Sequence, residues 1–234
     1  MGQSESDATF FERPEIRQLF RSVFSTLMVE SDRGAVLIGA SHVDFHLRDL
    51  FETIGPQSIS RGELRRTLEY PGPLSSLSAK ADVALITRLI SDSLHQAIHH
   101  LRRIRNDVAH SPNQFRLADH RHQLREMYEF IGPELPVAIN RYAAQLILDV
   151  AVQNVMSVKD PSDQSKPIFD SPEQVLDHFS QDSEILSTLD ERRPRCELAY
   201  GVSFICGLII LNRDKIKGVL GENTGSLAFL KPKP

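Results

Sequence analysis

Apolar residues recur at intervals of three and four along most of the chain, the spacing of one face of an α-helix. Few segments show the period of two that a half-buried β-strand requires. Short proline and glycine clusters separate the helical stretches. The first predicted helix begins near Pro14, and the second runs from Val36 to Ile54. Further helices are predicted over residues 78–89, 92–111, 117–130, 135–155, 175–179 and 194–214. The pattern therefore predicts an all-α helical bundle, with Ser78 and either Ser91 or Asp92 as N-caps.

These helices group into a core, an insertion and a closing helix. We expect a helical core over residues 1–136, a helical and acidic, loop-rich insertion over 137–191, a closing core helix over 192–215 and a mobile tail over 216–234. The closing helix is apolar on most of its circumference, which is typical of a buried helix. Its longest apolar run, Leu198–Leu211, has 14 residues. A bilayer span needs about 20, so we expect no contact with a membrane.

Composition narrows the class of protein further. The chain has 234 residues, of which 41% are hydrophobic and 25% charged, as in ordinary soluble domains. The net charge of −4 provides no long-range electrostatic attraction for the nucleic-acid backbone, so we expect no specific binding of duplex DNA. No signal peptide is evident at the N-terminus, and we expect a cytoplasmic protein. Cys196 and Cys206 lie on one predicted helix, too far apart for a disulfide.

Six of the nine histidines fall between His95 and His122, among several arginines. On an ideal helix one stripe would carry His95, His99, Arg102, Asn106 and His110. This stripe is either a solvated polar face or a site for an anion or phosphate, since arginine offers a fork of donors and histidine titrates near neutrality. His95, His99 and Arg102 are the candidates for contact with an anion or RNA.

Metal and cofactor signals are weak. His42 and His46, like His95 and His99, have the four-residue spacing of helical zinc ligands, but no third ligand is evident. The chain has no phosphate-binding P-loop and no serine nucleophile elbow. We therefore expect no metal and no cofactor.

Arg105 projects onto the apolar face of its helix, between Leu101 and Val108. A buried arginine needs a carboxylate partner, for which Asp32 is the first candidate and Asp82 the second. Such a structural ion pair would fix the packing of the helix of residues 93–110 against that of residues 32–54. A catalytic role for Arg105 is the alternative.

Several motifs resemble the mannitol operon repressor (MtlR) family. They are ESDRG (30–34) followed by VLIGASHVD, GPLSSLSAKADVA (72–84), LIS (89–91) and IRNDVAHS (104–111). The resemblance covers residues 18–136 and 192–213, whereas 137–191 departs from it. It implies an all-helical regulator, described as a repressor of sugar-alcohol uptake, without a DNA-reading element. Such a protein would act through contacts with an unknown regulatory protein, and we expect a homodimer.

The run RNDVAH is also similar to the R-x4-H signature of HEPN domains, a helical group that includes metal-independent RNases of toxin and defence systems. By this resemblance, Arg105 would neutralise phosphate charge, His110 would act as general acid or base, and Asn106 would orient them. On an ideal helix Arg105 and His110 point about 140° apart. They would converge only if the helix end frays or a second subunit completes the site, so the RNase is the alternative function.

Overall fold

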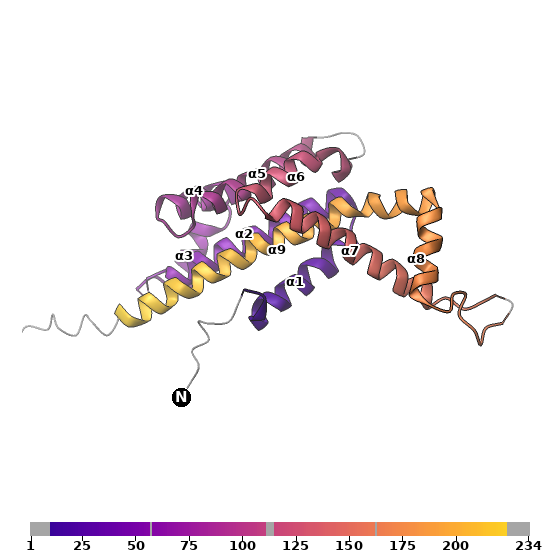
Figure 1. Cartoon of the computed structure of the whole chain (residues 1–234). Coiled ribbons are helices and arrows are strands. Elements are labelled where there is room, and N and C mark those ends of the chain that lie inside the picture. Colours follow the sequence, from indigo (N-terminus) through magenta and orange to yellow (C-terminus); the bar gives the residue numbers. More distant parts are fainter. Residues whose placement is uncertain (1–9, 57, 111–114, 162, 224–234) are drawn as a thin grey trace, which may run out of the picture.

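The computed structural model describes residues 10–56, 58–110, 115–161 and 163–223. Within these residues the chain forms α-helices and short 3-10 helices and no strand, which confirms the predicted all-α bundle (Figure 1). The elements in chain order are η2 (Phe10–Glu12), α1 (Pro14–Leu27), α2 (Asp32–Ile54), α3 (Arg61–Leu68), α4 (Leu77–Ile86), α5 (Asp92–His110), η3 (Leu117–His120), α6 (Arg121–Glu129), α7 (Leu135–Met156), α8 (Pro172–Gln181) and α9 (Ser183–Asn223).

The core forms around α2 and α9, which run side by side along the body of the molecule (Figure 1). Gly39 permits their close approach, because a Cβ there would lie 3.0 Å from a methyl group of Val202. The expected packing of α5 against α2 is confirmed, with Leu101 and Ile104 fully buried. Around this centre, α1, α4 and α6 bury their apolar faces in the same cluster.

α9 extends beyond the predicted closing helix in both directions. Pro194 was expected at its first turn but lies inside it, so the predicted start of this helix is wrong. A proline removes the hydrogen bond to the carbonyl four residues earlier, here that of Asp190. The Arg121 guanidinium donates to this carbonyl instead, at 3.1 Å, which satisfies the acceptor. Residues 216–223, expected in a mobile tail, are helical, whereas 224–234 lie outside the described residues.

Local hydrogen bonds explain where the smaller helices start. α3 was not predicted, although Ser60 and Glu63 form a capping box that the sequence pattern S-x-x-E indicates. Ser76, not Ser78, caps α4, since its hydroxyl accepts from the Ala79 N–H. Ser91 caps α5 as one of the two expected residues, accepting from the Leu94 N–H. The stop of α5 expected near Pro112 falls on residues that the structure does not describe.

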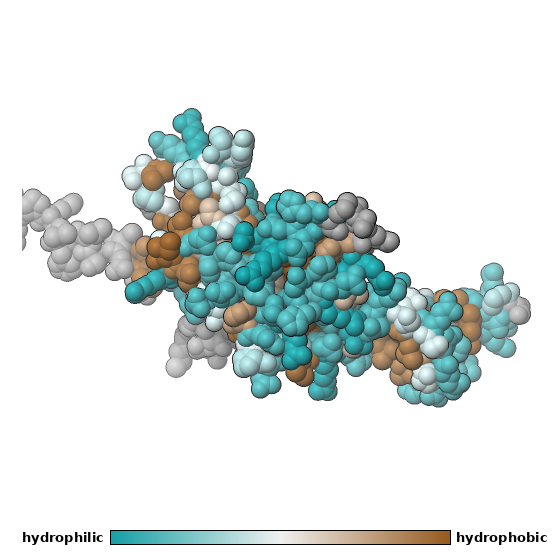
Figure 2. Space-filling model, turned by 90° about the horizontal axis from the view of Figure 1, so that it is seen from above, coloured by the Kyte–Doolittle hydropathy of each residue, from teal (hydrophilic) through white to brown (hydrophobic). Residues whose placement is uncertain are grey.

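α8, the outer part of α7 and the first turns of α9 project from the bundle as an arm (Figure 1). At the base of the arm, a second small cluster of buried residues, Ala143, Ile147 and Cys196, lies where α7 and α9 pack against the end of α1. Seen from above, the middle of the molecule is mostly polar, and apolar patches lie on the arm and at the opposite end (Figure 2). By length and composition alone, α7 and α9 are apolar enough to cross a membrane, but the apolar stretch of α9 is mostly buried inside the bundle.

Candidate functional site

A groove of about 650 Å³ lies between α2, the first turn of α4 and the second half of α5. We call it the α2–α5 groove. Its polar lining consists of arginine, serine, aspartate and asparagine side chains, and its apolar lining is contributed mainly by α2. The lining residues are Leu37, Ala40, Ser41, Asp44, Phe45, Arg48, Ser75, Ser76, Leu77, Ser78, Arg102, Arg105 and Asn106.

The α4 wall of the groove is held in place by a buried lysine. The Lys80 side chain is 1% exposed, and its Nζ lies 2.8 Å from Oδ1 of Asp44 on α2. The same Nζ donates to the Ser75 carbonyl at 3.3 Å. Because a buried ammonium without a carboxylate is costly, this pair fixes the start of α4 against α2.

Two arginines of α5 bring unpaired positive charge to the groove. In the described part of the chain, no carboxylate lies within ion-pair distance of Arg102 or Arg105. Arg105 donates only a long hydrogen bond, 3.5 Å, to Oδ1 of its neighbour Asn106. The Nε of Arg102 is buried without a partner. By contrast, Arg48 at the rim is paired with Glu69 and lies over the Phe45 ring.

The expected ion pair of Arg105 with Asp32 or Asp82 is wrong. Arg105 is exposed, because the buried stripe in this half of α5 passes through Leu101, Ile104 and Val108 and leaves Arg105 at its edge. Asp32 instead accepts from Arg195 at 2.7 Å and from the Leu117 N–H at 2.8 Å. The partner of Asp32 thus comes from α9.

The predicted stripe on α5 divides into three parts. Oδ1 of Asp82 on α4 lies 2.8 Å from Nε2 of His95 and 3.0 Å from Nε2 of His99. Arg102 and Asn106 line the groove. His110 is exposed at the last residue of α5 and is not among the groove-lining residues. The structure therefore brings Arg105 and Asn106 together but not Arg105 and His110.

The other histidine pair considered for metal lies on α2. Burial lowers the pKa of His42, and it lowers the pKa of His46 to about 4. His46 is therefore uncharged at neutral pH. Neither residue belongs to a group of three possible metal ligands among the described residues, whereas Asp82, His95 and His99 do.

A second cavity, which the sequence analysis did not anticipate, has a volume of about 380 Å³ and lies beside α6, α7 and α9. The buried Tyr128 hydroxyl in its wall has no hydrogen-bond partner. Burial raises the pKa of Glu197 there, and Asn140 donates to its carboxylate at 2.9 Å. These residues come from separate predicted helices, and no sequence motif links them.

No family model, no curated protein and no solved structure matches the chain. The resemblances to the mannitol operon repressor and HEPN families therefore stay predictions based on motifs. Three of those motifs nonetheless meet at one place in the fold. Asp44 ends VLIGASHVD, Ser75 belongs to GPLSSLSAKADVA, and Arg105 belongs to IRNDVAHS, and all three line the α2–α5 groove.

Proposed function

We propose that this chain is a cytoplasmic regulatory protein that binds an acidic segment of a partner protein in the α2–α5 groove. The observation that carries the proposal is the pair Arg102 and Arg105, which face an open groove and lack a carboxylate partner within the described residues. Guanidinium groups bind carboxylates through two parallel hydrogen bonds, so glutamate and aspartate side chains are suitable ligands.

The rest of the lining favours a peptide with apolar residues between its acids. Leu37 and Phe45 are exposed on the α2 wall and offer apolar surface. Ser75 and Ser78 supply hydroxyl groups at the opposite wall. The N-terminus of α4 points its partial positive charge toward the same region. An acidic amphipathic segment would complement all of these groups.

Binding to a protein rather than to nucleic acid is also consistent with the charge of the chain. A net charge of −4 gives no long-range attraction for a nucleic acid. The positive charge of Arg102 and Arg105 is local, which suits a short acidic segment better than a long polyanion. The proposed mode of action agrees with what the resemblance to the mannitol operon repressor family implies, namely regulation through protein contacts without reading DNA.

The alternative is a metal-independent RNase of the HEPN type. Arg105 and Asn106 lie in an accessible groove, as that function requires. His110, the general acid or base by resemblance, does not line this groove within one described chain. The RNase thus needs a rearrangement of the end of α5 or a contribution from a second subunit, and the peptide-binding function needs neither.

Fluorescence anisotropy with labelled probes tests the proposal. The probes are a peptide of glutamate and leucine, a single-stranded RNA and a duplex DNA. The test variant is Arg102→Gln with Arg105→Gln, and the matched control is Arg103→Gln, an exposed arginine of α5 outside the groove. Each charged hydrogen bond contributes about 1.5–3 kcal/mol, so the double variant should weaken peptide binding at least about tenfold.

The Arg103→Gln control should bind the peptide as tightly as the wild type does. The wild type should not bind the RNA more tightly than the peptide, and it should not cut the RNA. Equal loss of peptide binding in both variants would mean that only general charge matters and would refute the proposal. EDTA-resistant cleavage of RNA that His110→Ala abolishes would establish the RNase instead. Affinity capture from native cytosol, with and without RNase treatment, then identifies the partner.

A further inference from the structure

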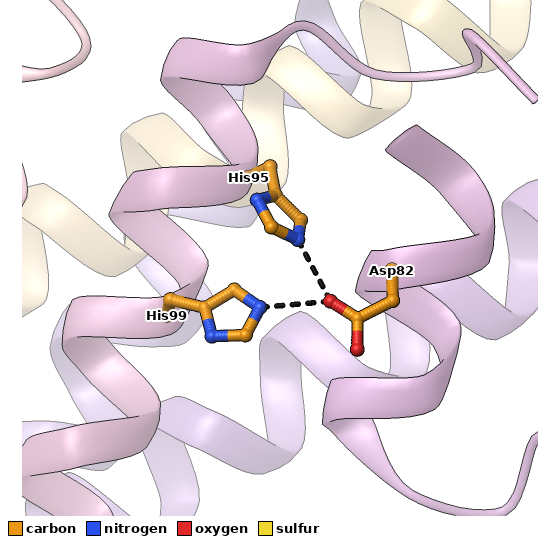
Figure 3. A group of neighbouring side chains, drawn as sticks. All are labelled: Asp82, His95 and His99. Carbon is orange, nitrogen blue, oxygen red and sulfur yellow. Dashed lines mark hydrogen bonds and ion pairs between the residues drawn. The ribbon is translucent and has the colours of Figure 1, made fainter. Parts of the chain in front are cut away.

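We propose that Asp82, His95 and His99 form a binding site for a transition-metal cation of the Zn²⁺ class, which is independent of the proposed peptide binding. Two imidazole nitrogens and one carboxylate oxygen converge on a common point between α4 and α5 (Figure 3). This proposal replaces the sequence-based expectation of no metal. His95 and His99 already had the spacing of helical ligands, and the fold adds the third ligand, Asp82, from a different helix.

The distances suit a metal that enters between the three side chains. Nε2 of His95 and Nε2 of His99 lie 2.8 Å and 3.0 Å from the same atom, Oδ1 of Asp82. Ligands of a tetrahedral zinc ion lie about 2.0–2.1 Å from the metal and hence about 3.3 Å from one another. The two nitrogen–oxygen distances therefore need to lengthen by only about 0.3–0.5 Å. All three ligand atoms already lie within 4.8 Å of one another.

The surroundings hold the ligands in place and leave one side open. Oδ2 of Asp82, the oxygen that faces away from the histidines, lies 3.4 Å from the Ser78 hydroxyl, the kind of outer contact that orients metal-binding carboxylates. The His95 and His99 side chains are 13% and 20% exposed, and that of Asp82 is 48% exposed. A cation can therefore enter from solvent, and water can complete its coordination.

The donor set selects the class of metal. Imidazole favours zinc and other late first-row cations, whereas Mg²⁺ and Ca²⁺ require mostly oxygen ligands in larger numbers. On binding, each ring must offer the unprotonated Nε2 and carry its proton on Nδ1. Nδ1 of His95 is buried without a hydrogen-bond partner, so only the contacts of Nε2 and ring packing orient this side chain.

A second histidine–carboxylate cluster in the same region provides a matched control. Glu126 on α6 contacts Nδ1 of His100 through one oxygen and Nδ1 of His122 through the other, each at 3.3 Å. The two nitrogens contact different oxygens of the Glu126 carboxylate, and the His122 side chain is almost fully exposed. The Glu126 cluster therefore has the same donor groups, two imidazoles and one carboxylate, without a common point for a metal.

The test is isothermal titration of the untagged, metal-stripped full chain with Zn²⁺ in the presence of excess Mg²⁺. We expect one Zn²⁺ per chain for the wild type and for Glu126→Gln. Asp82→Asn and His99→Gln should each weaken binding by about 100-fold or more, because each removes a direct ligand. Circular dichroism without metal verifies that the variants are folded.

An NMR titration of the wild type keeps the proposal testable if a variant does not fold. Zn²⁺ should shift the Nε2 resonances of His95 and His99 at one equivalent and leave those of His122 unchanged. No binding, or binding that survives both Asp82→Asn and His99→Gln, would overturn the proposal and leave the cluster as a hydrogen-bonded contact between α4 and α5. Loss of Zn²⁺ binding has no bearing on the peptide assay, so the two proposals fail separately.

Discussion

The two halves of α5 carry similar polar side chains but use them differently. In the first half, His95 and His99 meet the Asp82 carboxylate of α4. In the second half, Arg102 and Arg105 face a groove without an acidic partner in the described chain. The first half is paired with α4, whereas the second half leaves two guanidinium groups facing the groove.

The difference arises from where α4 lies. Asp82, in the middle of α4, is opposite the first half of α5, whereas the start of α4 at Ser76 is opposite the second half. That start presents serine hydroxyls and no carboxylate, so the arginines remain unpaired. The placement of one short helix thus decides which part of α5 is paired with a carboxylate and which part faces the groove.

The largest effect on this arrangement should come from Asp44→Ala. Lys80 is almost fully buried and would lose its carboxylate partner. Breaking such a pair costs about 3–5 kcal/mol, and we expect about 3 kcal/mol because Asp44 itself is partly exposed. Urea denaturation measures the change. The control Ser41→Ala, at the same groove, should change the free energy of unfolding by less than about 0.5 kcal/mol. If Asp44→Ala lowers the free energy of unfolding by less than about 1 kcal/mol, the pair does not anchor α4.

Asp82→Asn should have an intermediate effect. At neutral pH without metal it should lower the free energy of unfolding by about 1 kcal/mol, because it weakens two partly exposed contacts. Hydrogen bonds from His95 and then His99 hold the pKa of Asp82 below its ordinary value. The ionised carboxylate therefore stabilises the fold above the pKa it has in the unfolded chain, and this contribution is lost as pH falls through the lower folded pKa. The difference between wild type and Asp82→Asn in the free energy of unfolding should shrink below about pH 4. A difference that grows as pH falls below about 4 would contradict this assignment.

The smallest effect on stability should come from Arg105→Ala. The side chain is exposed and forms one long hydrogen bond to its neighbour, so the free energy of unfolding should change by less than about 0.5 kcal/mol. Thermal and urea melts of the variant measure this. A fall of several kcal/mol in the free energy of unfolding would instead support the buried ion pair that was predicted from the sequence.

The sequence predicted the helical class because apolar spacing is a local property that survives in the fold. It missed the continuation of α9 through Pro194, since the compensating donor, Arg121, lies about 70 residues away in the chain. It also missed α3, although Ser60 and Glu63 carried a usable capping signal.

The candidate site was less predictable because it depends on which helix covers which part of α5. The helical stripe grouped Arg102 with Asn106, and both line the groove. It also included His95 and His99, which contact Asp82 of α4 and do not line the groove. Arg105 was assigned to the core from ideal helical angles, and a small offset of the buried stripe places it at the surface. The pairing of Asp82 with the two histidines is a tertiary contact that no local pattern indicates.

The most direct test of the contrast within α5 is an NMR titration of the full chain with the acidic peptide, observing arginine Nε–H and histidine ring signals together. We expect the Arg102 and Arg105 signals to shift with peptide, while those of His95, His99 and Arg103 stay in place. Shifts at His95 and His99 without shifts at Arg102 and Arg105 would contradict it, because the paired half of α5 would then be the half that binds.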